Sequence, residues 1–207
     1  MKLLRTHAFA ASLFILAQLP AAAALVTYTL TGGGGSAVVD GTAFIATGYS
    51  IAATADTSTI VSGSWNGFPV NYNPVVPTIT LLTSGAPVIL TLLPTAGFSW
   101  VALAGGDDSG RNHGFFLFKD LVTEPEAFSD IDSTPGTYSD LATPNTYSGS
   151  IQTSMIALPT SGGQFDMISD AFTGTFTISA VPEPASAAAT LLPSLAGILL
   201  VSRRRRS

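Results

Sequence analysis

The sequence predicts an all-β fold, an antiparallel β-sandwich with a jelly roll as one form of it, and three observations support this. Apolar and polar side chains alternate with a period of two over residues 25–31 and 172–179, which is typical of half-buried strands. The dipeptides Asp40-Gly41 and Asn66-Gly67 favour two-residue hairpins because both tolerate positive φ. No segment of residues 25–180 shows an amphipathic helical period of useful length.

The other expected strands are short and follow one another at about ten-residue spacing, as in sandwiches. Gly32 to Gly35 is expected at the tip of a hairpin, and residues 73–77 and 129–148 are expected to be loops. The remaining expected strands are 44–54, 78–82, 88–93, 98–104, 115–119 and 150–157.

The first 24 residues are typical of a secretory signal peptide. Basic residues precede an apolar run over 8–19, and small residues follow it. Ala22 and Ala24 are placed for cleavage before Leu25. We therefore expect export through the Sec machinery, which leaves residues 25–180 as one extracytoplasmic domain. The alternative is a retained N-terminal anchor.

The last 27 residues, 181–207, contain three contiguous parts. Val181-Pro182-Glu183-Pro184 is followed by an apolar run over 185–201 and by Arg203, Arg204, Arg205 and Arg206. The run of 17 residues would form a helix about 26 Å long, slightly shorter than a hydrocarbon core of about 30 Å. Arginines beside such a span favour a cytoplasmic C-terminus, which leaves the body on the outer side.

This order of parts resembles the PEP-CTERM sorting signal of exported bacterial proteins. The resemblance implies recognition and processing by a membrane-embedded exosortase, in a bacterium with an outer membrane. It also implies a precursor anchored in the inner membrane by a single C-terminal helix, then a cell-surface or extracellular protein linked to exopolysaccharide or biofilm. An ordinary C-terminal anchor that is never cut is the alternative.

Charge is distributed unevenly along the chain. The formal net charge is −5, but six of the eight basic residues lie in the two targeting ends. The body keeps Arg111 and Lys119 against twelve acidic residues, a formal net charge of −10. Such a domain has little with which to neutralise phosphates, so nucleic acid is excluded as an expected partner. The chain has no cysteine, which excludes thiol catalysis and Cys-ligated metals.

The residues available for catalysis favour a protein that is not an enzyme. There is no Gly-x-Ser-x-Gly motif, and a serine hydrolase would need His113, the one histidine of the body, as its base. We expect His113 to be a polar loop residue. A glycoside hydrolase needs two opposed carboxylates. The candidates for that pair are Asp107, Asp108, Asp120, Glu124 and Glu126.

A calcium site is the one metal site that the sequence suggests. Asp107 and Asp108 lie in a polar, Gly-rich segment whose oxygens suit Ca²⁺. However, the twelfth position from Asp107 is Phe118, where an EF-hand has a bidentate glutamate. We therefore expect a solvated turn and no cofactor, with a weak Ca²⁺ site as the alternative.

Aromatic side chains around the Asn66-Gly67 turn are candidates for glycan contacts. Trp65 and Phe68 flank the turn and Tyr72 follows, and sugar rings stack on such faces. Packing in the core is the alternative. The sequence thus favours a non-enzymatic structural or matrix protein. A lectin-like glycan-binding module is the alternative function, and a glycoside hydrolase comes third.

Overall fold

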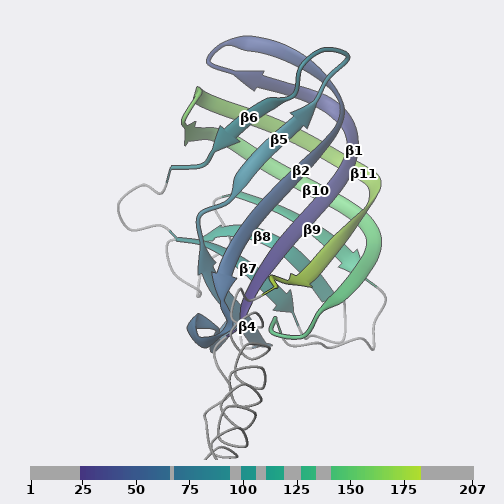
Figure 1. Cartoon of the computed structure of the whole chain (residues 1–207). Coiled ribbons are helices and arrows are strands. Elements are labelled where there is room, and N and C mark those ends of the chain that lie inside the picture. The colour runs from purple at the N-terminus through teal and green to yellow at the C-terminus, as the bar shows by residue number, and fades with distance from the viewer. Residues whose placement is uncertain are drawn as a thin grey trace, which may run out of the picture.

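The computed structural model describes residues 24–65, 68–93, 99–105, 111–118, 127–133 and 141–182. Over these residues the fold is all-β, with a single 3-10 turn, η1 (Thr57–Thr59), between two strands. The described strands are β1 (Leu25–Val39), β2 (Thr42–Asp56), β3 (Val61–Trp65), β4 (Phe68–Val75), β5 (Thr78–Leu82), β6 (Val88–Thr91), β7 (Ser99–Gly105), β8 (Arg111–Phe118), β9 (Ala127–Ser133), β10 (Asn145–Thr160) and β11 (Gly163–Ala180) (Figure 1).

All described strands belong to one sheet, in the order β3-β4-β7-β8-β9-β10-β11-β1-β2-β5-β6. Every neighbouring pair is antiparallel, which confirms the predicted all-β antiparallel class. The two separate sheets of a sandwich are not seen among these strands. Strands β1, β2, β10 and β11 are 15 to 18 residues long, and twist accumulates along strands of this length. The single sheet therefore curls back on itself.

One end of the sheet carries the Asp40-Gly41 and Ser161-Gly162 turns, and we call it the hairpin pole. Here the edge strand β6 closes onto β10. Leu92 forms an antiparallel bridge with Thr160, and the backbone N–H of Leu93 donates to the carbonyl of Pro159 at 2.9 Å. Strands β10, β11, β1, β2, β5 and β6 therefore form a closed ring around the interior (Figure 1).

The opposite end, which carries both ends of the described chain, is the terminal pole (residues 24–27, 55–61, 141–146 and 178–182). Here a buried asparagine joins distant strands. Asn73 of β4 donates from Nδ2 to the carbonyl of Asp56 and to the hydroxyl of Tyr28, both at 3.0 Å. Its Oδ1 accepts from Thr59 at 2.5 Å, and Tyr28 donates to the carbonyl of Leu141 at 3.1 Å. These bonds attach β4 to β1 and to the end of β2.

The glycine predictions have opposite outcomes. Asp40 and Gly41 have φ of 48° and 77°, so the predicted two-residue hairpin is confirmed there. The prediction that Gly32 to Gly35 forms a hairpin tip is wrong, because these residues lie within β1 and pair with β2. A Cβ at Gly32 would lie 2.6 Å from Cζ of Tyr49, so this glycine makes room for the tyrosine ring.

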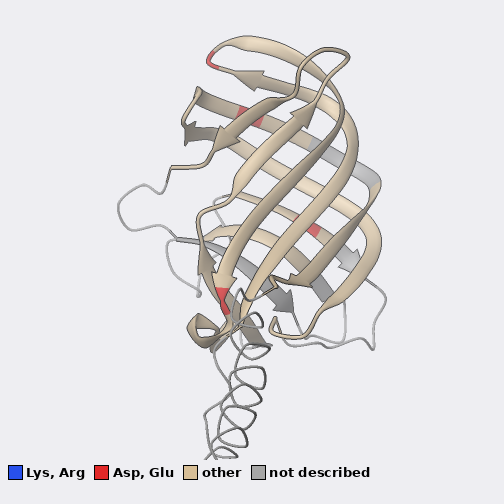
Figure 2. Cartoon of the chain, in the orientation of Figure 1, with Lys and Arg blue, Asp and Glu red and all other residues tan. Residues whose placement is uncertain are grey.

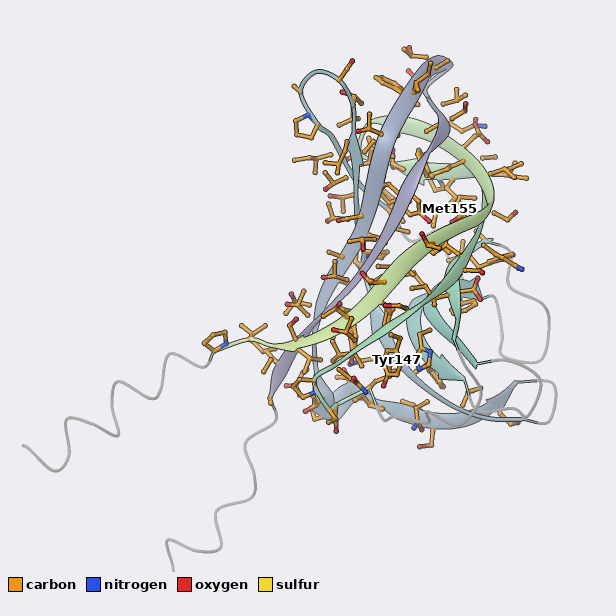
Figure 3. The ribbon with its side chains drawn as sticks, turned by 90° about the vertical axis from the view of Figure 1, so that its right-hand side faces the viewer. Tyr147 and Met155 are labelled. Atoms are coloured by element: carbon orange, nitrogen blue, oxygen red, sulfur yellow. The ribbon has the colours of Figure 1, made fainter. Side chains whose placement is uncertain are left out.

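Aromatic rings fill the interior near the terminal pole. The rings of Tyr28 and Phe176 stack with centroids 6.2 Å apart, and the Phe115 ring meets Phe176 edge-on at 6.2 Å. Figure 3 shows Tyr147 and Met155, which lie in different halves of β10, and both side chains are buried. The long strands therefore contribute to the core along their whole length.

Candidate functional site

Both ends of the described chain leave the sheet side by side at the terminal pole (Figures 1 and 3). The backbone N–H of Val181 donates to the carbonyl of Leu25 at 2.9 Å, which extends the β1–β11 ladder. On the other side of β1, Thr57 N–H donates to the Ala24 carbonyl at 3.0 Å, and Ala24 N–H donates to Thr57 Oγ1 at 3.2 Å. The predicted signal-peptide and sorting junctions thus occupy one corner of the sheet.

The described surface of this pole carries a single charged side chain. Asp56 Oδ1 accepts from the backbone N–H of Ser58 at 2.7 Å, and the hydrogen bonds from Ser58 hold the pKa of Asp56 below its usual value. Leu25 is 43% exposed, Val181 is half-buried and Pro182 is exposed. The corner around the predicted sorting motif is therefore mostly uncharged.

Several predicted site residues lie outside the described residues. These are Ala22 of the signal-peptide site, the C-terminal helix and the carboxylates proposed for a glycosidase. Glu183 and Pro184 of the sorting motif and Asp107 and Asp108 of the possible calcium site also lie outside them, as does the membrane-retention cluster of Arg203, Arg204, Arg205 and Arg206. The functions expected for these residues stay predictions.

The candidate glycan-contact residues come from one hairpin at the edge of the sheet. Trp65 of β3 and Phe68 of β4 are register partners that close the hairpin, which leaves two residues for its turn. Tyr72, also on β4, pairs with Val61 and is half-buried. Because side chains alternate along a strand, this register assigns positions 65, 68 and 72 to one face. The side chains of Trp65 and Phe68 are not among those described.

The outer surface of the central strands carries a regular set of hydroxyl groups, which we call the hydroxyl face. Thr31 of β1 and Thr175 of β11 are cross-strand partners whose hydroxyls lie 2.7 Å apart. Figure 2 shows that the strands drawn there carry few charges. The hydroxyl face consists of Thr27, Thr29, Thr31, Ser50, Thr54, Thr78, Thr80, Thr91, Thr146, Ser148, Thr175, Thr177 and Ser179.

A buried cluster of three hydroxyls joins opposite walls of the fold. The Tyr49 hydroxyl of β2 lies 2.7 Å from Thr153 Oγ1 of β10 and 3.1 Å from Ser129 Oγ of β9. Ser129 and Thr153 are themselves 2.8 Å apart. Burial is the main cause that raises the pKa of Tyr49 above 10.0, because the phenolate would lose its hydration. The cluster stabilises the fold only while Tyr49 is neutral.

Replacing Tyr49 with phenylalanine is expected to lower the free energy of unfolding at pH 8 by about 1 to 3 kcal/mol. Since folding raises the tyrosine pKa, the wild type loses this contribution as the pH rises above about 10. The stability difference between the two proteins should therefore narrow between pH 8 and pH 11. Urea unfolding of both proteins at each pH measures it, and a constant difference would contradict this assignment.

His113 lies in β8, so the prediction that it is a loop residue is wrong. Its side chain is fully buried, and its ring stacks on Tyr147 with centroids 3.8 Å apart and an angle of 14° between the planes. Phe176 lies at 6.0 Å from the same ring. The candidate catalytic base of the sequence is thus part of an aromatic stack in the interior.

Among the described residues, no three His, Cys, Asp or Glu side chains gather in a way that could hold a metal ion. The described part of the chain also contains no helix that is long and apolar enough to span a membrane.

Sequence reasoning missed the polar residues that join distant strands. Tyr49, Ser129 and Thr153 are far apart in the chain, and Asn73 lies in a segment expected to be a loop. The only local signal is that Asn73 precedes a proline, which by itself indicates a turn.

The chain was also compared with protein-family models, curated proteins and solved structures, and no match was found in any of the three.

Proposed function

We propose that this chain is an exported bacterial protein of the cell surface or extracellular matrix, sorted by an exosortase through its C-terminal signal. One observation carries the proposal. The junctions with both predicted targeting segments lie at the same corner, where Val181 bonds to Leu25 and Ala24 bonds to Thr57. A body tethered by either end would therefore present the same pole to the membrane and the hairpin pole to the outside.

The body is proposed to act without catalysis, in association with exopolysaccharide. The hydroxyl face supports this role because each hydroxyl both donates and accepts hydrogen bonds, as sugar hydroxyls do. Its outward positions are uncharged, and the acidic body favours neutral over anionic polymers. The burial of His113 in the aromatic stack also supports a non-catalytic body.

Sorting is tested by replacing Pro182, Glu183 and Pro184 with alanines in the full-length chain. We expect this variant to accumulate as an unprocessed membrane-anchored precursor, since the rigid proline-containing stretch is the part that a processing enzyme would recognise. Pulse–chase labelling in an exosortase-bearing bacterium measures the loss of the C-terminal segment. Processing and surface delivery equal to those of the wild type would contradict the proposal.

A lectin-like glycan-binding module is the second candidate function. The specific observation that favours it is the register of the β3–β4 hairpin, which assigns positions 65, 68 and 72 to one face at the edge of the sheet. Stacking of a sugar ring on such aromatic residues is the chemistry expected there.

Trp65→Ala is expected to weaken saturable glycan binding at the β3–β4 hairpin. A stacked ring contributes about 1 kcal/mol or more beyond buried area, so affinity should fall at least fivefold. A glycan array, with and without Ca²⁺, measures this, with Phe115→Ala as a core control that affects stability instead. If Trp65→Ala bound glycans with unchanged affinity, the β3–β4 hairpin would not be the glycan-binding site.

A further inference from the structure

We propose that the folded body restricts access to its own sorting motif, and that processing requires the end of β11 to separate from β1. This inference rests on the proposed sorting function and concerns how that site is regulated. Its starting point is the hydrogen bond from Val181 N–H to the Leu25 carbonyl, at 2.9 Å. The first residue of the motif is thus the last residue of the sheet.

The short distance between sheet and membrane makes this bond important. From Val181 to Ala185, where the predicted apolar span begins, the chain can extend at most about 13 Å at roughly 3.3 Å per residue. A membrane-embedded enzyme would have to bind the motif within that gap, against a folded pole. Separation of residues 179–181 from β1 would add about 10 Å of free chain.

The structure also shows where this separation would stop. β10 pairs with β11 as far as the Asn145–Ile178 pair, so among the described strands residues 179–181 pair with β1 alone. Ser179 and Ala180 are exposed, so releasing them uncovers little apolar surface. Ile178 is 2% exposed, so opening beyond it would disrupt the core. The movable end is therefore three residues long.

The partner of this end is held firmly. Val26 of β1 is 1% exposed, and β1 pairs with β2 as well as with β11 from its first residues. Leu25 pairs with Asp56 of β2 on the side of β1 that faces away from β11, and this pairing remains after the predicted cleavage before Leu25. Opening of this corner therefore means movement of β11, while β1 stays in place.

A disulfide tests the inference directly. Thr27 and Ser179 are cross-strand partners on the outer face, and the chain has no cysteine of its own. The oxidised full-length Thr27→Cys/Ser179→Cys variant should be processed more slowly than the wild type by at least about fivefold, the factor that one net backbone hydrogen bond represents, because a covalent bond prevents residue 179 from separating. Reductant should restore the rate. Thr31→Cys/Thr175→Cys is the matched control, because it joins the same strands four residues further from the motif.

A linker tests the same inference in the opposite direction. Six Gly and Ser residues inserted between Ala180 and Val181 remove the need to open the sheet, so processing should become about fivefold faster. The same linker inserted in the Asp40-Gly41 turn, at the hairpin pole, should leave the rate unchanged.

The outcomes separate this inference from the proposed function. If the wild type keeps its C-terminal segment in an exosortase-bearing bacterium, the sorting proposal fails and the inference fails with it. If the wild type is processed but the oxidised Thr27→Cys/Ser179→Cys variant and the linker variant keep the wild-type rate, sorting stands and the inference is overturned. Slowing by the disulfide together with acceleration by the linker supports it.

Discussion

Replacing Gly114 with alanine is expected to lower the free energy of unfolding of the body by roughly 3 kcal/mol or more, as overpacking at a rigid contact does. A Cβ at this position would overlap the carbonyl oxygen of Ser129 and lie 2.5 Å from the Cα of Asp130. Both atoms belong to the backbone of β9, which cannot rotate away as a side chain can.

The effect should extend beyond the β8–β9 pair. A displaced Ser129 would lose its contacts with Tyr49 and Thr153, since the hydroxyl cluster depends on the position of β9. Thermal unfolding should show a melting temperature lowered by about 10 °C for a domain of this size. Gly85→Ala is the control, because its nearest neighbour would lie 3.8 Å away. Equal melting temperatures for Gly114→Ala and the wild type would contradict the described β8–β9 packing.

Replacing Asn73 with leucine is expected to lower the free energy of unfolding by about 2 to 4 kcal/mol, because three hydrogen bonds of a fully buried side chain are lost. Leucine has a similar size, so the loss reports on polar contacts more than on a cavity. Without the bonds to Asp56 and Tyr28, β4 is held to the end of β2 less firmly.

Hydrogen exchange measures the local part of this effect. Amides of β3 and β4 should exchange faster in Asn73→Leu than in the wild type. Asn71→Leu is the matched control on the same strand, since Asn71 accepts from Ser62 at the exposed edge. We expect it to change stability less than Asn73→Leu does, because Asn71 is only half-buried whereas Asn73 is fully buried. If the two substitutions changed stability and exchange equally, the Asn73 bonds would not be what holds β4 to β1 and to the end of β2.

The elements that the sequence predicted well are those whose pattern is local. Alternation with threonine identified residues 25–31 of β1 and the end of β11, and Asp-Gly identified the first hairpin. Strand β9 was missed because most of it lies in residues 129–148, which were expected to form a loop, although the side chains of Ser129 and Asp130 are buried. Their environment is created by β8, β10 and Tyr49, which no local pattern records.

The arrangement of all described strands in one sheet could also not be predicted from the sequence. The expected strands were short, whereas β10 and β11 continue through residues with little alternation, helped by bulges near Ile151 and Met155. The candidate sorting motif could be recognised because its residues are contiguous. Its bond to Leu25 could not, since the two residues lie at opposite ends of the body and meet only when the sheet is complete.

The central claim is that the C-terminal segment is a signal that is removed after export. Intact-mass analysis of the protein recovered from the surface and medium of an exosortase-bearing bacterium tests it most directly. The account predicts a chain that begins at Leu25 and has lost Arg203 to Arg206. A recovered protein that still carries Arg203 to Arg206 would contradict it and indicate an uncut anchor.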